Sequence, residues 1–285
     1  MKIGIVTDST STLTPEESKK LSVPIVSLYI KKNDEFLKAV DLDLEEYGKF
    51  LDECTEIPST SQPNPADFQK VFEEIKNKYS SVIIPVISKE LSGTFQSSKI
   101  AEDSVEGKFK TVDSKLTASG LGFLIENLVE YSKKGAPDVE MVFYAKNFYK
   151  KVMTIFSVDD LKYLYKGGRL SKGSSVIGNL LNIKPIISLQ NGVLKPIKKV
   201  RGNKKLISEM VQMASEIDYQ RMTIVYSGRK EDAELLASKL MDKLGVIDIP
   251  IKHLEAVVMT HLGNKALGLI IEGKGDIYIW KNFFW

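Results

Sequence analysis

The sequence predicts two domains of different class, an α/β domain over residues 1–150 and an α+β domain over residues 151–285. The first half alternates strand and helix patterns, which indicates a Rossmann-like parallel sheet with helices on both faces. The second half carries more strand patterns than helix patterns, which indicates a mixed sheet. The length of 285 residues exceeds that of one average domain and allows a large buried interior.

Polar residues follow three of the strands expected in the first half. Apolar runs typical of buried strands lie at 2–8, 81–87 and 109–114, and helix patterns lie at 44–54, at 66–79 and up to Tyr131. In parallel sheets with helices on both faces, ligands bind beyond the carboxyl ends of the strands. We therefore expect the stretches at 7–10, 92–94 and 112–114 to project from one edge of the sheet.

The stretch IPSTSQPNP at residues 57–65 places short polar side chains between prolines. Proline fixes φ at about −65° and removes an N–H group, so we expect a loop here rather than a helix or an internal strand. Asn64 and Pro65 are typical of the start of the next helix. The hydrogen-bonding side chains on this stiffened segment are Ser59, Thr60, Ser61 and Gln62.

Strand patterns dominate the second half of the chain. Asn191-Gly192 is a strong signal for a β-hairpin between two of these strands. Helices are expected near 159–166, 203–217 and 230–244. The strand patterns lie at 152–158, 183–189, 193–200, 222–228, 249–256, 267–273 and 276–281.

Composition narrows the class of protein. The 40 Lys and Arg residues against 37 Asp and Glu give a formal charge of +3, too small for a protein that binds polyanions over its whole surface. Cys54 is the single cysteine, which rules out a disulfide framework and fits a reducing compartment. With no signal-peptide pattern at the start and no apolar run of about 18 residues, we expect a soluble, cytoplasmic protein.

Several kinds of catalytic and metal chemistry lack their sequence signals. Neither of the phosphate-binding patterns, the Walker pattern and G-x-G-x-x-G, occurs in the sequence. The two histidines, His253 and His261, are not accompanied by the G-x-S-x-G elbow of serine hydrolases, and their spacing matches no recognised metal site. We therefore expect no bound metal. In KGGRLSKGSS (166–175), a helix C-cap at Gly167 or Gly168 is favoured over anion binding, while Arg169 is able to serve a partner or an acidic group.

The acidic and basic candidates also have structural interpretations. Asp8, Asp113 and the pair Asp159-Asp160 stand at strand ends or helix starts, where aspartate commonly caps the backbone. The stretch 195–205 holds six Lys and Arg residues, but it lacks the interleaved aromatic residues that stack on bases. A solvated strand edge is therefore favoured over contact with nucleic acid, and we expect no nucleic-acid partner.

Neutral hydroxyl groups and one imidazole remain as candidates for a binding site. Thr60, Ser61, Ser92 and Thr94, together with His261, suit holding an acid or a carbonyl group rather than transforming it. An apolar cavity between the domains would enclose an alkyl tail attached to that group.

Eight short motifs occur in order along nearly the whole chain: TDST (7–10), TSQP (60–63), SKELSGTFQSS (88–98), VDS (112–114), YLYKGGRLS (163–171), IKPIISLQNG (183–192), VRGNKK (200–205) and THLG (260–263). In this order they resemble the DegV family of bacterial fatty-acid-binding proteins. The resemblance implies a DegV-like fold with one long-chain fatty acid, such as palmitate, stearate or oleate, enclosed between two domains. It also implies that the chain has no cofactor and is not itself an enzyme.

The same resemblance implies a partner. Several members of the family are the acyl-carrying subunit of bacterial fatty acid kinase, whose other subunit supplies ATP and metal and converts the carboxylate to an acyl phosphate for phospholipid synthesis. By that similarity Arg201 and Arg169 lie where the kinase subunit binds. The aromatic C-terminal stretch 275–285 is interpreted first as an edge strand, and a transient membrane contact is compatible with it.

Site residues follow from the resemblance as well. Thr60, Ser92 and His261 are expected to hydrogen-bond the carboxylate, and Ser61, Gly93 and Thr94 to shape the loops. The sequence departs from the family after His261, because Asn264-Lys265 replaces the usual Pro-Gly. Two alternatives stay open: an esterase-like hydrolase that uses Ser92 and His261, and a nucleic-acid regulator that binds through 195–205.

Overall fold

The computed structural model describes residues 2–32, 35–170 and 182–277. By its contacts the chain divides into two compact units. Unit 1 comprises Met1–Leu42 and Pro58–Tyr149, and unit 2 comprises Asp43–Ile57 and Lys150–Trp285. Residues 43–57, which the sequence analysis places in the first domain, thus pack with the second half of the chain.

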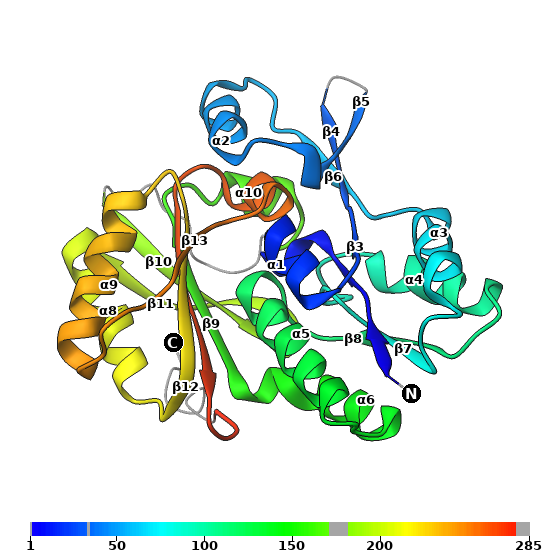
Figure 1. Cartoon of the computed structure of the whole chain (residues 1–285). Helices are drawn as coiled ribbons and strands as arrows, with labels where there is room; N and C mark the ends of the chain where they lie inside the picture. The colour runs from blue at the N-terminus through cyan, green and yellow to red at the C-terminus, as the bar shows by residue number, and fades with distance from the viewer. Residues whose placement is uncertain (1, 33–34, 171–181, 278–285) are drawn as a thin grey trace. The chain divides into compact units, whose positions relative to one another are not determined.

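Unit 1 contains the expected parallel sheet (Figure 1). Strands β1 (Ile3–Ile5), β7 (Ser81–Val86) and β8 (Phe109–Asp113) pair in parallel, and β2 (Thr7–Asp8) pairs in parallel with β3 (Ile25–Val26). A hydrogen bond of 3.1 Å from Val6 N to Ile83 O connects the end of β1 to β7 just before β2 begins. The predicted alternation of strands and helices is therefore confirmed for this unit.

The helices of unit 1 pack on the sheet because β7 is apolar on both sides. Val82, Ile84 and Val86 of β7 share a buried cluster with Phe72, whose ring stacks on Phe109 with 4.4 Å between centroids. Helix α3 (Pro65–Ile75) contacts α4 (Thr94–Ser104), and α5 (Ala118–Lys133) contacts α6 (Asp138–Asn147). The shorter helices are α1 (Pro15–Leu21), η1 (Ser9–Ser11), η2 (Ala39–Asp41) and η3 (Phe148–Lys151), the last of which crosses the boundary between the units.

The expectation of a loop throughout 57–65 is wrong for three residues. Ser59–Ser61 forms strand β6, which pairs antiparallel with β4 (Tyr29–Lys32) in a small sheet of order β5-β4-β6, where β5 is Glu35–Lys38. The prolines lie outside the paired residues, and β6 is an edge strand, so no ladder hydrogen bond is lost to proline. Helix α3 does begin at Pro65, with Asn64 as its N-cap.

Aspartates that the sequence offered as possible catalytic acids are structural. Asp8 is fully buried and accepts hydrogen bonds from Thr10 N (2.8 Å), Thr10 Oγ1 (2.6 Å) and Ile87 N (2.7 Å). Burial raises the pKa of Asp8, while these hydrogen bonds act in the opposite direction. Asp160 accepts a bond from Lys162 N (2.8 Å), and Asp159 pairs with Lys184 (2.8 Å). These contacts agree with a capping or pairing role.

Unit 2 contains a six-stranded mixed sheet of order β11-β10-β9-β14-β12-β13. All neighbouring strands are antiparallel except β12 and β13, which are parallel. The hairpin between β10 and β11 turns at Asn191 (φ 51°) and Gly192 (φ 86°), as predicted. The strands are β9 (Val152–Val158), β10 (Ile183–Gln190), β11 (Val193–Arg201), β12 (Tyr219–Ser227), β13 (Ile251–His253) and β14 (Ala266–Gly273).

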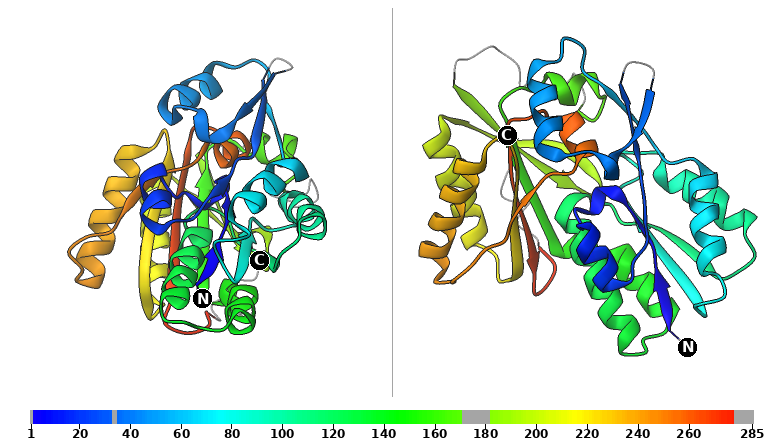
Figure 2. Two further views of the ribbon diagram at one scale, coloured as in Figure 1. Left: turned by 45° about the vertical axis from the view of Figure 1, so that its right-hand side comes forward. Right: turned by 45° about the horizontal axis from the view of Figure 1, so that its top comes forward.

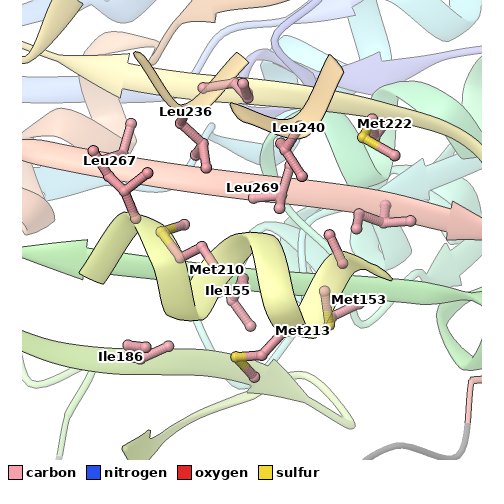
Figure 3. Packing of buried hydrophobic residues seen from close by; sticks show 14 of the residues in the cluster. Met153, Ile155, Ile186, Met210, Met213, Met222, Leu236, Leu240, Leu267 and Leu269 are labelled. Atoms are coloured by element: carbon pink, nitrogen blue, oxygen red, sulfur yellow. The ribbon is translucent and has the colours of Figure 1, made fainter. Parts of the chain in front are cut away.

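Two helices cover one face of this sheet. Helices α8 (Asn203–Ser215) and α9 (Lys230–Leu244) lie on the same side of it in both views of Figure 2. Met210 of α8 and Leu236 of α9 pack there against Ile155 and Leu269 (Figure 3). The other helices of the unit are short: α2 (Leu44–Glu53), α7 (Lys162–Lys166) and α10 (Ala256–Leu262).

Two strands that the sequence predicts near the C-terminus are not found in full among the described residues. The strand expected at 249–256 is limited to Ile251–His253, because α10 already begins at Ala256. Most of the strand expected at 276–281 lies outside the described residues. In the described ranges, no helix has both the length and the apolar character that a membrane crossing requires.

Candidate functional site

The first group of predicted site residues lies at the start of helix α4 in unit 1. Gly93 is the N-cap of α4 and has no side chain with which to cap the helix, while Ser92 Oγ accepts a hydrogen bond of 3.4 Å from Thr94 N, the first N–H group of the helix. The hydroxyls of Ser92 and Thr94 hydrogen-bond each other at 2.9 Å, and Thr94 is fully buried. Ser92 N donates to Ser88 O (3.1 Å), which fixes this turn just beyond the end of β7.

Gln62 joins this turn to the segment that carries Thr60 and Ser61. Its Nε2 donates to Ser97 Oγ at 2.9 Å. Its Oε1 lies so close to Gly93 that a Cβ on Gly93 would stand 1.8 Å away. Only glycine admits this approach of a side chain to the backbone. The structure thus brings the TSQP and SGT motifs into direct contact.

The electrostatics of this turn suit a carboxylate. The N-terminus of a helix carries partial positive charge and N–H groups that point outwards, so it attracts anions. The hydroxyls of Ser92 and Thr94 add neutral donors next to it. Asp113, in the VDS motif, is occupied instead with Lys89 N (3.2 Å) and Lys115 N (3.1 Å). Its role is therefore to hold neighbouring loops.

His261 belongs to unit 2, in the last turn of α10. The preceding residue, Thr260, is buried and hydrogen-bonds Tyr47 OH at 2.7 Å. On the other side, Ser227 Oγ donates to Gly263 O at 2.8 Å. The imidazole lies against Gly167, where an added Cβ would stand 2.3 Å from His261 Nδ1. The backbone around His261 is therefore fixed from several elements of this unit.

His261 is neutral at physiological pH. Burial lowers the pKa of its imidazole to about 3, and the positive charge of Arg169 acts in the same direction. A neutral imidazole has one N–H donor and one acceptor nitrogen. It is suited to donate a hydrogen bond to a carboxylate or carbonyl oxygen without adding a charge.

The two arginines predicted to bind a partner differ in their surroundings. Arg169 is half-buried, donates to Gly167 O, and has a pKa lowered by burial. Arg201 is exposed at the end of β11, which is an edge strand of the sheet. The nearby lysines 198 and 205 both pair with Glu209, so part of the basic stretch is neutralised within the fold.

Each unit also contains a surface cleft away from these residues. One, of about 510 Å³ in unit 2, is lined by charged side chains of α2 and α9 and by Tyr226, His253 and Asn264. The other, of about 660 Å³ in unit 1, is an apolar groove between α5 and α6 lined by Tyr131, Val139, Phe143 and Tyr144. The predicted ligand-binding residues line neither of them.

The predicted site residues are divided between the two units. Unit 1 holds Thr60, Ser61, Ser92, Gly93 and Thr94, and unit 2 holds Arg169, Arg201 and His261. Gln62 stands within the TSQP motif, but no local sequence signal indicates that it links two loops. Among the described residues, no group of three or more His, Cys, Asp or Glu side chains is placed to hold a metal ion.

Comparison with known proteins places this fold in a family. Protein DegV of Bacillus subtilis is 31% identical over 276 residues, which cover 94% of this chain and 98% of that protein. A DegV domain-containing protein of Halalkalibacterium halodurans is 32% identical over 275 residues, with 94% and 97% covered.

Solved structures of relatives have the same architecture. A DegV family protein from Thermus thermophilus, described as fatty acid binding, matches with a TM-score of 0.89 at 28% identity, over 96% of this chain and 100% of that chain. Bacillus subtilis DegV, described as a fatty acid binding protein, matches with a TM-score of 0.86 at 30% identity and the same coverage. The sequence model described as "Uncharacterised protein, DegV family" matches residues 2–274. The chain belongs to the DegV family.

Proposed function

We propose that this protein binds one long-chain fatty acid and holds its carboxylate with Thr60, Ser92 and His261. The observation that carries the proposal is the start of α4, where the hydroxyls of Ser92 and Thr94 meet beside the first N–H groups of the helix. Two relatives with solved structures are described as fatty acid binding, which supports the same class of ligand. Ser61, Gly93 and Thr94 keep the shape of the loops in this proposal.

Neutral donors are an appropriate choice for this ligand. An ionised carboxylate only accepts hydrogen bonds, and hydroxyls, backbone N–H groups and a neutral imidazole can all donate to it. The contact between Gln62 and Gly93 holds the two hydroxyl-bearing segments in place before the ligand arrives. Such preorganisation lowers the entropic cost of binding. The acyl chain then supplies most of the affinity, at about 0.8 kcal/mol for each buried methylene group.

We further propose that the protein presents its fatty acid to a separate, ATP-dependent kinase subunit. That subunit forms the acyl phosphate used in phospholipid synthesis, and this chain supplies no catalytic group. The exposed position of Arg201 at the edge of the sheet, beside exposed Lys199 and Lys204, supports a docking role. Concentrated positive charge raises the rate of association with an acidic partner more than it changes stability.

Replacing a carboxylate donor should weaken fatty-acid binding without unfolding the protein. We expect Ser92→Ala and Thr60→Ala each to lose about 1 kcal/mol of binding free energy, the worth of one neutral hydrogen bond. Thermal-shift measurements with and without palmitate should therefore show a smaller ligand-induced rise in Tm for both. The exposed neighbour Ser59→Ala is the matched control and should behave like the parent. Equal ligand-induced stabilisation in all four proteins would refute the carboxylate assignment.

The pH dependence of stability should report on His261. Its pKa is lowered to about 3 in the folded protein from 6.5, so the unfolded chain takes up this proton first as the pH falls. The stability contributed by neutral His261 is thus fully present above about pH 6.5 and is lost as the pH falls towards 3.

We expect His261→Gln to reduce the fall in Tm between pH 7.5 and pH 5.5 by roughly 2 to 3 °C, measured by calorimetry. His253→Gln, which removes the other imidazole, is the matched control, and the effect is the difference between the two variants. A His261→Gln profile that coincides with that of His253→Gln would contradict the assignment of a buried, neutral His261.

The docking role of Arg201 can be separated from ligand binding. Arg201→Ala should keep its bound fatty acid but support acyl-phosphate formation several-fold more slowly with a cognate ATP-binding subunit, and added salt should slow the parent in the same way. Lys195→Ala, an exposed cation on the same strand, is the matched control. The docking role would be refuted if Arg201→Ala supported acyl-phosphate formation at the parental rate at limiting protein, or if this variant lost its bound lipid.

A further inference from the structure

Helix α2 carries a glycine in its interior, where glycine is unfavourable compared with alanine. Gly48 lies in the middle of Leu44–Glu53 and is buried. A Cβ at this position would stand 2.6 Å from Asn264 Oδ1 and 2.9 Å from Asn264 Cγ. The space that an alanine methyl group would occupy is therefore filled by the side chain of Asn264, which follows α10.

Asn264 is held on both its side chain and its backbone. Its Nδ2 donates to Asp52 Oδ2 of α2 at 2.8 Å. Its carbonyl oxygen lies against Gly228, where φ is +59° and an added Cβ would be 2.0 Å away. Because both glycines leave room for this one residue, its position relative to α2 is tightly constrained. We refer to Gly48, Asp52 and Asn264 as the α2 clasp.

Helix α2 also fixes the chain on the other side of His261. Thr260 Oγ1 donates to Ala256 O at 2.8 Å, so its partner Tyr47 OH is the donor in their 2.7 Å hydrogen bond. Tyr163 OH donates to Leu51 O of α2 at 2.8 Å, and its ring lies against Gly263, 2.7 Å from where a Cβ would be. Residues 260, 263 and 264 are thus all positioned by α2 or by a side chain bonded to it.

We infer that helix α2, through the α2 clasp and Tyr47, positions the imidazole of His261 for its ligand. These are positioning residues, because they act on His261 through the backbone of 260–264. The inference rests on the proposed function in one respect, namely that His261 contacts the carboxylate. It adds that a segment from the N-terminal half of the sequence, residues 43–57, sets the geometry of a binding group near the C-terminus.

Two substitutions and their combination test the clasp. In Gly48→Ala the new methyl group displaces Asn264, and we expect palmitate affinity, measured by calorimetry, to fall about fivefold. In Asn264→Ala the obstacle is absent, so adding Gly48→Ala to it should change the affinity little. Glu46→Ala, an exposed change on the same helix, is the control and should bind like the parent. The inference would be overturned if Gly48→Ala lowered the palmitate affinity by the same factor in the parent and in Asn264→Ala. It would also be overturned if Gly48→Ala alone bound palmitate with the affinity of the parent.

A second readout needs no ligand. With two histidines in the chain, the imidazole NMR signals of His261 and His253 can be assigned by substitution. We expect both Gly48→Ala and Tyr47→Phe to shift the His261 signals. Tyr47→Phe should leave the His253 signals in place, since it removes only the hydroxyl that bonds Thr260. Unchanged His261 signals in a folded variant would overturn the inference. If the parent fails to bind palmitate, the proposed function falls, while these signals still decide the role of the clasp.

Discussion

Close approach of side chains to glycine backbone is the constraint on which both groups of candidate site residues depend. In unit 1, the amide of Gln62 lies where a Cβ of Gly93 would stand, and this contact joins the strand of Thr60 to the start of α4. In unit 2, the imidazole of His261 lies against Gly167, and Asn264 lies against Gly48. At each of these positions any other residue would push a polar side chain away from the place where it bonds or donates.

Both groups of candidate site residues offer neutral hydrogen-bond donors. The start of α4 offers a helix terminus and two hydroxyls, which hydrogen-bond each other. His261 is neutral because burial and the charge of Arg169 both disfavour its protonated form. Asp8 and Asp113, which lie at strand ends, accept hydrogen bonds from backbone N–H groups. Neutral donors of this kind can satisfy the lone pairs of a carboxylate, which is what the proposed binding of a fatty acid requires.

Much of the fold could be predicted from the sequence because its local signals are strong and independent. The run 152–158 reads as a strand in isolation, and Asn191-Gly192 specifies its hairpin through positive φ angles. The short strand 59–61 was missed because its pairing with residues 29–31 is a tertiary contact, while its prolines dominate the local pattern. The packing of 43–57 with the second half was missed for the same reason. An amphipathic helix shows that it has a buried face but not which partner covers it.

For the candidate site, which stays a prediction, local motifs and long-range contacts differ in the same way. Its hydroxyls and His261 could be named because they stand in short motifs at strand and helix ends. The residues that hold these groups in place could not be named from the sequence. The partners in their hydrogen bonds, Gln62 with Ser97, Tyr47 with Thr260 and Asn264 with Asp52, lie from 35 to 213 residues apart. The sequence alone carries no signal for such pairs.

Mass spectrometry of lipid extracted from the natively purified protein decides whether the chain carries a fatty acid. We expect one long-chain fatty acid, at close to one molecule per chain in the parent and markedly less in a variant that combines Thr60→Ala, Ser92→Ala and His261→Gln. A parent protein that carries no fatty acid, or the same amount as this variant, would contradict this expectation. Release of fatty acid from an added ester by the parent, but not by the variant, would instead favour a hydrolase.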